Sequence, residues 1–598
     1  MRELLQLNHY FVRYKWHFLS GILFVAISNL FAIFPAQVIR YAIDFVQDTL
    51  AVYPAFDTPA FSESYQDVLS YAVLLFSGLV IVLSILKGFF MYLMRQTIIV
   101  MSRYIEFDLK NDIFDKYQRL SMAFYKRNNT GDLMNRISED VSRVRMYVGP
   151  AIMYTINLIV LFVMVIATML SVNPTLTLYV LTPLPILSIL IYWVSREINQ
   201  RSEVVQAKLS DLSSFVQEAF SGIRVIKAYN RLPEREHEFT EECNTYKETN
   251  LDLVKINALF LPAMILLIGL STILTIYIGG QLTIEGKVSP GNIAEFVIYV
   301  NMLTWPVASV GWVTSLVQRA AASQRRINEF LNAEEEIQNP SQADLNVQGA
   351  ISFKNVSFTY PDSGVKALQN VSFDVKPGES LAIIGHTGSG KSTIANLICR
   401  LYDPTAGSIY VDGQDLKTLN LDHYRSSIGY VPQEVFLFSE SINNNIAFST
   451  SIANHNTTAV HQAAENAWVK HNIQSFPKGF DTKVGERGIT LSGGQKQRIS
   501  IARAIIKQPQ ILIFDDCLSA VDTETEERIL NNLQDLMESK TTVIVSHRVS
   551  SVKHCDHIIV LGDGQIIEEG RHDDLIKKEG VYFDIHEQQQ LESLKSLD

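Results

Sequence analysis

Six hydrophobic stretches in the first 320 residues constrain the fold of this 598-residue chain more than any other feature. A helix needs about 20 mostly apolar residues to cross the ~30 Å hydrocarbon core of a bilayer. One such stretch could be a buried helix of a water-soluble domain, but six in half of a chain leave little room for that alternative. The pattern predicts an all-α transmembrane domain over residues 1–330, with spans near 17–39, 69–94, 147–171, 175–195, 256–280 and 293–317.

The charges between the spans predict the orientation. The loop after the first span carries Asp48, Asp57, Glu63 and Asp67 and no Lys or Arg, whereas the segments 95–145 and 196–255 are rich in both. Cytoplasmic segments carry the excess of Lys and Arg. We therefore expect a multi-pass protein of the cytoplasmic (inner) membrane with both termini in the cytosol.

The segments 95–145 and 196–255 look like helical extensions of the spans, with breaks at 128–132 and 231–234. The first residues, MRELLQLNHYFVRYKWHF, lack a small-residue cleavage site, so they predict a short interfacial helix instead of a signal peptide.

Few ionisable residues lie within the spans. Arg40 and Asp44, four residues apart, are interpreted as an ion pair on one helix face. Lys87 either extends to the membrane surface or contacts an anionic substrate. No series of carboxylates suits a proton-driven pump, so the energy must come from elsewhere.

Composition excludes several other classes. The net charge of −11 argues against a nucleic-acid partner. The four cysteines show no metal-ligand spacing, so we expect neither a zinc site nor a disulfide framework.

After a polar, acidic linker at 331–350, residues 351–598 alternate short β-rich runs with helical patterns, which predicts an α/β domain. The segment LAIIGHTGSGKST has the G-x-x-x-x-G-K-[ST] spacing between a predicted strand and a predicted helix, the context of a phosphate-binding loop. Its glycines let backbone N–H groups face phosphates, the lysine neutralises them, and the serine can bind Mg²⁺. The predicted nucleotide-binding residues here are Gly385, His386, Thr387, Gly388, Ser389, Gly390, Lys391, Ser392 and Thr393.

A second apolar strand, ILIF, is followed by Asp515 and Asp516. P-loop enzymes hold their metal with a carboxylate at this place, so Asp515 is the predicted Mg²⁺ ligand. The adjacent Asp516 occupies the position from which a base could polarise the attacking water.

At LSGGQKQR (491–498) the motifs become those of a family. Together with the P-loop and the strand before Asp515, this segment closely resembles the signature of ABC transporter ATPases. The resemblance implies that two such domains enclose two ATP molecules, each between one chain's P-loop and the other chain's signature. It assigns nucleotide contacts to Ser492, Gly493, Gly494 and Gln495.

Other residues resemble family features in the expected order. Tyr360 resembles the aromatic residue that stacks on adenine, Gln433 the glutamine that senses Mg²⁺, and His547 the γ-phosphate histidine. VGERG (484–488) and SAVD (519–522) resemble the exporter loop and the D-loop. FYKRNNTGDLMNRISEDV and GIRVIKAYN resemble the cytoplasmic loops of six-span exporters, so the chain looks like a half-transporter.

One residue departs from the family pattern, in which glutamate usually follows the metal-binding aspartate. Asp516 is one C–C bond shorter, about 1.5 Å, and a misplacement of about 1 Å can cost roughly a hundredfold in rate. We therefore expect this chain's own site to bind ATP and hydrolyse it slowly. The catalytic residues that the resemblance implies are Asp516, His547 and Gln433, and the metal ligands are Ser392, Gln433 and Asp515.

Two slow sites would drive a pump poorly, so the sequence favours a heterodimer with a second half-transporter. A functional homodimer stays open, since His547 is intact. The expected function is ATP-driven export of amphipathic drugs or lipids by alternating access; the alternatives are an ATP-gated channel, a regulatory membrane protein or a homodimeric lipid flippase.

Overall fold

The structure, a computed structural model, describes residues 2–52, 59–340, 346–450, 457–518 and 523–595. Its contacts divide the chain into two units. The first unit, here called the transmembrane unit after its predicted spans, comprises Met1–Lys116 and Gly131–Ala333. The second, here called the ATPase unit after its predicted motifs, comprises Tyr117–Thr130 and Glu334–Asp598. The segment Tyr117–Thr130 is thus part of the second unit, although the sequence prediction includes it in the transmembrane domain, residues 1–330.

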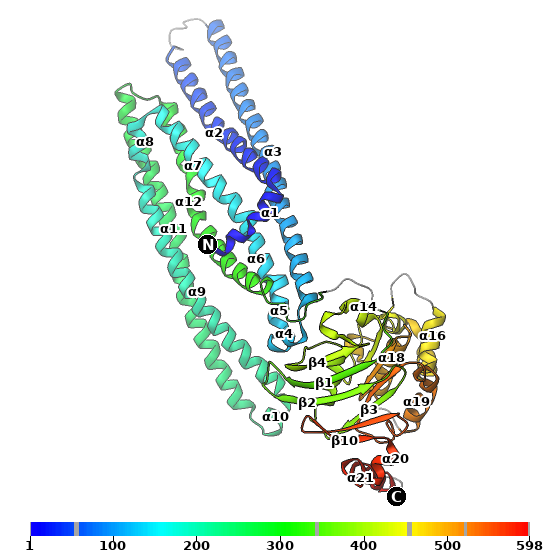
Figure 1. Cartoon of the computed structure of the whole chain (residues 1–598). Coiled ribbons are helices and arrows are strands. Elements are labelled where there is room, and N and C mark those ends of the chain that lie inside the picture. Colours follow the sequence, from blue (N-terminus) through cyan, green and yellow to red (C-terminus); the bar gives the residue numbers. More distant parts are fainter. Residues whose placement is uncertain (1, 53–58, 341–345, 451–456, 519–522, 596–598) are drawn as a thin grey trace. The chain divides into compact units, whose positions relative to one another are not determined.

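The first part of the chain is helical, as predicted (Figure 1). After a single 3₁₀ segment (Arg2–Leu7), its helices are α1 (Asn8–Arg13), α2 (Lys15–Val52), α3 (Pro59–Arg119), α4 (Met122–Arg127), α5 (Thr130–Asn135), α6 (Val141–Met146), α7 (Ile152–Val172), α8 (Pro174–Leu181), α9 (Pro183–Ser221), α10 (Ile223–Ala228), α11 (Leu232–Ile284) and α12 (Pro290–Leu331). Two π-helical turns join α5, α6 and α7 into one continuous rod.

Five helical segments among the described residues are long and apolar enough to cross a membrane, and they match five of the six predicted spans. The remaining stretch, 175–195, is divided between α8 and α9. The division falls at Thr182 and Pro183, because proline has no N–H to continue the helical ladder.

The residues before the first span are helical but are not simply exposed at a surface. Leu4, Leu7 and Tyr10 are buried. The Tyr14 hydroxyl donates to Asp108 of α3 at 2.9 Å, and Arg13 pairs with the same carboxylate. One face of the predicted interfacial segment therefore packs on protein.

The interpretation of Arg40 and Asp44 as an ion pair is wrong. Arg40 pairs instead with Glu295 of α12 at 3.1 Å, and Glu295 is fully buried. Asp44 accepts hydrogen bonds from the Ser289 hydroxyl at 2.7 Å and from the Gly291 N–H at 2.8 Å. Asp44 is therefore bonded to the start of α12, more than 240 residues away in sequence, and not to Arg40 on its own helix.

The second part of the chain is the predicted α/β domain. In the described residues its strands are β1 (Ile351–Thr359), β2 (Lys366–Val375), β3 (Ser380–Gly385), β4 (Ala406–Val411), β5 (Gln414–Asp415), β6 (Ile428–Val431), β7 (Ile511–Asp515), β8 (Thr541–Val545), β9 (His557–Gly562) and β10 (Gln565–Gly570). Its helices are α13 (Lys391–Ile398), α14 (Leu421–Ser426), α15 (Ile442–Ala447), α16 (Thr457–Asn466), α17 (Lys470–Gln474), α18 (Gly493–Ile505), α19 (Thr523–Met537), α20 (His572–Lys577) and α21 (Val581–Lys595).

The described strands form two sheets, one antiparallel in the order β2-β1-β4-β5 and one in the order β10-β9-β3-β8-β7-β6. In the second sheet β9, β3, β8, β7 and β6 are parallel. Such a sheet is buried on both faces, which is why its strands read as continuous apolar runs.

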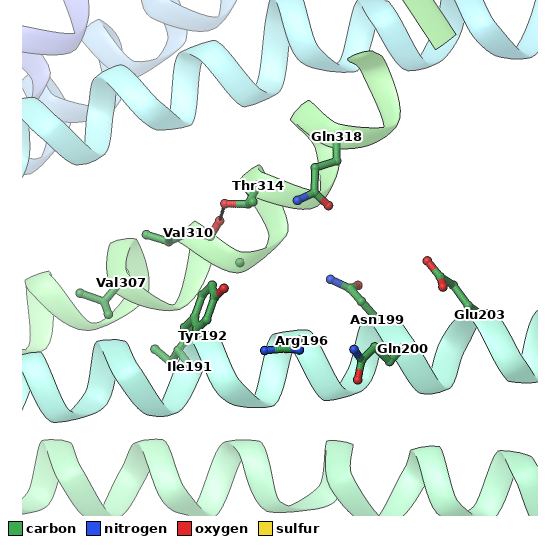
Figure 2. A pocket seen from close by; sticks show the side chains of 11 residues that line it. Ile191, Tyr192, Arg196, Asn199, Gln200, Glu203, Val307, Val310, Thr314 and Gln318 are labelled. Carbon is green, nitrogen blue, oxygen red and sulfur yellow. Dashed lines mark hydrogen bonds between the residues drawn. The ribbon is translucent and has the colours of Figure 1, made fainter. Parts of the chain in front are cut away.

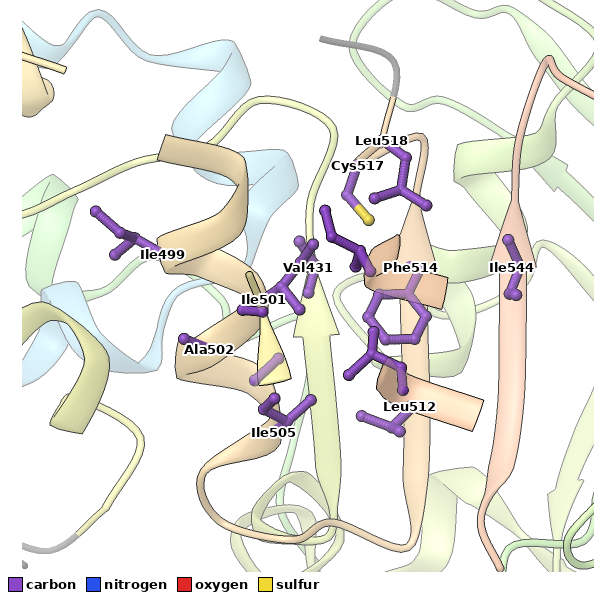
Figure 3. Packing of buried hydrophobic residues seen from close by; sticks show 14 of the residues in the cluster. Val431, Ile499, Ile501, Ala502, Ile505, Leu512, Phe514, Cys517, Leu518 and Ile544 are labelled. Carbon is purple, nitrogen blue, oxygen red and sulfur yellow. The ribbon is translucent and has the colours of Figure 1, made fainter. Parts of the chain in front are cut away.

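Strand β7 shows this burial residue by residue. Leu512 and Phe514 belong to one hydrophobic core, where they pack with Ile501 and Ile505 of α18 (Figure 3). Ile511 and Ile513 point to the other core, beneath the antiparallel sheet. All four side chains are nearly inaccessible, so the strand that ends in Asp515 is held rigidly from both sides.

All four cysteines, Cys243, Cys399, Cys517 and Cys555, are free thiols in the structure.

Candidate functional site

The predicted site residues follow adjacent parallel strands. The P-loop follows β3, His547 follows β8, Asp515 and Asp516 come at the end of β7, and Gln433 follows β6. These four strands are neighbours in the order β3-β8-β7-β6. Because parallel strands end at the same edge of a sheet, segments up to 160 residues apart meet there.

Backbone geometry in the P-loop requires glycine at two places. Gly385 and Gly390 have φ of 151° and 100°, where a side chain is strained. A Cβ on Gly385 would lie 2.2 Å from the Leu561 carbonyl oxygen, and one on Gly390 would lie 2.3 Å from that of Ala367. The loop is therefore built for close backbone approach, as a phosphate cradle requires.

Lys391 begins α13 with its ammonium group inside the loop. Its Nζ donates to the carbonyl oxygens of Gly385 and His386, both at 2.8 Å, and the residue is 5% exposed. Burial lowers the pKa of Lys391 to about 8, although the charges of Asp516 and Asp515 oppose the shift. Polyphosphate would supply the negative charge that this buried cation lacks.

The residues for a metal ion fit Mg²⁺. The Ser392 hydroxyl donates to Asp515 Oδ1 at 2.8 Å, which brings two hard oxygen ligands together at the P-loop. Burial raises the pKa of Asp515, and the hydrogen bond from Ser392 lowers it. Bound there, Mg²⁺ would neutralise charge on the phosphate oxygens. Among the described residues no group of three His, Cys, Asp or Glu side chains could hold a metal, so phosphate and water oxygens would complete the shell.

Asp516 lies beside this oxygen pair. Its Oδ2 accepts a hydrogen bond from Gln433 Nε2 at 3.2 Å, and its own N–H donates to the Val545 carbonyl oxygen of β8 at 2.8 Å. The residue has φ of 47°, in the left-handed region that aspartate tolerates better than most residues. Main-chain bonding to β8 therefore fixes where the short carboxylate can reach.

His547 faces the same edge. Burial lowers the pKa of its imidazole and the charge of Lys391 lowers it further, whereas Asp516 and a hydrogen bond with the Gly385 backbone oppose the shift. The ring is consequently neutral at neutral pH, with one nitrogen able to donate and one able to accept a hydrogen bond.

Tyr360 lies next to the P-loop helix, with its hydroxyl 3.0 Å from the Thr393 hydroxyl. Its neighbour is Lys126, whose Nζ is 4.7 Å from the centre of the Tyr360 ring. Lys126 belongs to α4, and Ala123 of that helix is buried in the ATPase core. Only the fold brings α4 to the expected adenine-binding residue, and no spacing signal could have shown it.

The signature residues begin another helix. Ser492 caps α18: its hydroxyl accepts from the Gln495 N–H at 3.3 Å, and the Gln495 side chain accepts from the Ser492 N–H at 3.0 Å. This capping box orients Gly493 and Gly494 at the positive end of a 13-residue helix.

The remaining predicted residues are placed as follows. His386, Thr387 and Gly388 are exposed at the tip of the P-loop, and Ser389 is buried. The Ser389 hydroxyl has no partner among the described residues, so it is a donor available inside the loop. The predicted D-loop, 519–522, lies outside the described residues.

Comparisons with known proteins agree with these motifs. The family model described as ABC transporter transmembrane region matches residues 18–307, and the ABC transporter model matches residues 368–519. The chain is similar to a probable multidrug resistance ABC transporter ATP-binding/permease protein, YheI, of Bacillus subtilis (strain 168). The two are 34% identical, over 98% of this chain and 97% of the relative.

An ATP-dependent lipid A-core flippase of Pseudomonas syringae pv. syringae (strain B728a) is 32% identical over 80% of this chain and 79% of its own length. A solved structure of a bacterial Atm1-family ABC exporter with ATP bound has a TM-score of 0.76 at 25% identity, and the match covers 96% of this chain and 98% of that one. The chain therefore belongs to the ABC transporters, as a membrane-spanning half-transporter whose ATPase domain binds and hydrolyses ATP with Mg²⁺.

Proposed function

We propose that this chain is one half of an exporter that moves amphipathic drugs or lipids outward across the cytoplasmic membrane by alternating access. The relatives named for multidrug resistance and for lipid A-core flipping support this substrate class. The Lys and Arg-rich segments 95–145 and 196–255 support a cytosolic ATPase domain.

One observation carries the mechanism: the candidate site residues follow adjacent strands and lie beside the buried Lys391. They are Ser392, Asp515, Asp516, Gln433 and His547. In the proposed site, Lys391 and the P-loop N–H groups bind phosphates, and Ser392 and Asp515 hold the metal. Gln433 and Asp516 position the attacking water, and neutral His547 hydrogen-bonds the terminal phosphate.

We propose further that this site turns over slowly. A homodimer with full activity would need a backbone shift that advances the Asp516 carboxylate toward the water. The hydrogen bond of 2.8 Å from the Asp516 N–H to Val545, in the buried strand β8, opposes such a shift. Slow hydrolysis here favours a heterodimer in which the capped signature, Ser492 to Gln495, serves a competent site on the partner.

The test of assembly is purification with and without a half-transporter encoded beside this one. In a heterodimer, Ser492→Ala should depress steady-state ATPase more than Asp516→Ala, because Ser492 would serve the faster site. Equal losses from the two substitutions, in a chain that purifies as a pair of identical subunits, would support the homodimeric flippase instead.

The test of export is ATP-dependent accumulation of a fluorescent amphiphile in inside-out vesicles, with Lys391→Ala as the inactive control. Uphill accumulation that Lys391→Ala abolishes is expected for a pump. Passive, ATP-gated flux that never exceeds equilibrium would contradict export and support the channel.

A further inference from the structure

A cavity within the transmembrane unit lies between α9 and α12. Its volume of about 320 Å³ is within the range of small-molecule sites, roughly 300–1,000 Å³. Figure 2 shows Tyr192, Asn199 and Glu203 projecting from α9 toward α12, which contributes Val310, Thr314 and Gln318. Both helices belong to one contact unit, so one protomer builds this cavity by itself.

The lining changes character along the helices. Ile191, Val307 and Val310 make one end apolar, and Arg196, Asn199 and Gln318 make the other end polar. Arg196 follows Ile191 by five residues, about 7.5 Å along the helix axis. The cavity therefore suits a molecule whose polar head lies about 7.5 Å from its apolar body.

The side chain of Arg196 is exposed, and no described side chain is its ionic partner. No ion pair or hydrogen bond of its guanidinium is found in the part of the chain that the structure describes. The next arginine on the same helix, Arg201, pairs with Glu197 at 3.6 Å. The planar guanidinium of arginine donates two parallel hydrogen bonds to carboxylate or phosphate oxygens. Arg196, beside an apolar surface, is therefore suited to bind an anionic group of a ligand.

The position of Arg196 along the chain points to the same ligand. It is the first charged residue after the apolar run 183–195, and it begins the segment 196–255, whose Lys and Arg residues place it in the expected cytosolic part. A molecule taken from the inner side of the membrane would meet Arg196 at head-group depth, with its apolar part toward Ile191.

From this arrangement we propose that the α9–α12 cavity binds an amphiphile with a single anionic group, held by Arg196, with its apolar body against Ile191, Val307 and Val310. This inference rests on the proposed export of amphiphiles and names their charge. Glu203 lies seven residues, about 10.5 Å, beyond Arg196 on the same helix. Its carboxylate repels a second negative charge, so the cavity discriminates against dianionic head groups.

The test measures binding directly, in the full-length protein in an uncharged maltoside detergent. The probes are a dansyl-labelled undecanoate and its methyl ester, which have the same body and differ in charge. We expect the carboxylate to bind about tenfold more tightly than the ester, as a partly exposed charge-assisted hydrogen bond allows. Arg196→Ala should abolish this preference, and Arg196→Lys should keep part of it.

Two further variants make the result specific to the cavity. Val310→Trp fills its apolar end and should weaken both probes, whereas Arg201→Ala removes a paired arginine from the same helix and should leave the preference intact. A carboxylate preference that survives Arg196→Ala, or equal effects of Arg196→Ala and Arg201→Ala, would overturn the proposal.

Competition identifies the source of the ligand. Displacement of the probe by phosphatidylglycerol points to a membrane lipid, and displacement only by single-chain anionic compounds points to a soluble amphiphile.

Glu203→Gln should improve binding of a dianionic alkyl phosphate relative to the carboxylate, and no change would refute the role of Glu203. Because these readouts need no ATP, an Arg196-dependent preference in a chain that fails to export would uphold the cavity and refute the proposed function.

Discussion

Asp516→Glu is the substitution that tests the proposed slow site most sharply. It keeps the charge and extends the carboxylate by one C–C bond, about 1.5 Å. If the short side chain leaves the carboxylate about 1 Å from its optimum, correcting it gains up to roughly a hundredfold in rate.

Two features of the structure reduce that gain. The hydrogen bond of 3.2 Å from Gln433 to Asp516 has to be remade, which costs about 1 kcal/mol, or roughly fivefold. The φ of 47° at residue 516 suits glutamate less well than aspartate, but this strain affects folding more than the chemical step. The expected net increase is therefore about tenfold or more.

The assay is single-turnover ATP hydrolysis by the purified complex, with the partner's corresponding carboxylate neutralised so that only this site reports. Asp516→Asn is the matched control, because it keeps the size and the left-handed backbone and removes the charge. The reasoning is refuted if Asp516→Glu and Asp516→Asn both hydrolyse ATP at the wild-type rate. Another group, such as a signature residue of the partner, would then limit the rate.

Three other predictions follow from particular contacts. At pH 8, ATP binding should take up about half a proton per site, since bound phosphates raise the pKa of Lys391 from about 8. The affinity for ATP should therefore fall as the pH rises above about 8. Calorimetry in buffers of different ionisation enthalpy measures the proton uptake, and Lys391→Arg should show none. Glu336 of the linker accepts hydrogen bonds from Ser121 and Arg127 in the segment carrying α4, so Glu336→Ala should weaken stimulation of the ATPase by amphiphiles several-fold and leave ATP affinity unchanged. Buried Glu526 accepts from Arg548 at 2.7 Å and from Ser551; Glu526→Gln should destabilise the ATPase domain by about 2 kcal/mol, seen as a lower melting temperature of the full-length protein, whereas exposed Glu527→Gln should not.

Motif spacing located much of the candidate site. The P-loop pattern needs only a strand, a glycine-rich turn and a helix, all local in sequence, so the chain itself predicts phosphate binding by Lys391 and metal binding by Ser392. The apolar strand before Asp515 could also be recognised in the sequence, because burial on both faces of the sheet removes polar residues from the run.

The sequence by itself determined the class of the protein, because membrane thickness imposes the length of each hydrophobic stretch and phosphate chemistry imposes the glycines and the lysine. It could not show that Arg40 pairs with Glu295, that Lys126 lies over Tyr360, or that Arg196 lines a cavity between α9 and α12. Those arrangements depend on which helices pack side by side. Packing brings together residues that are distant in the chain, and no local periodicity or spacing records that proximity.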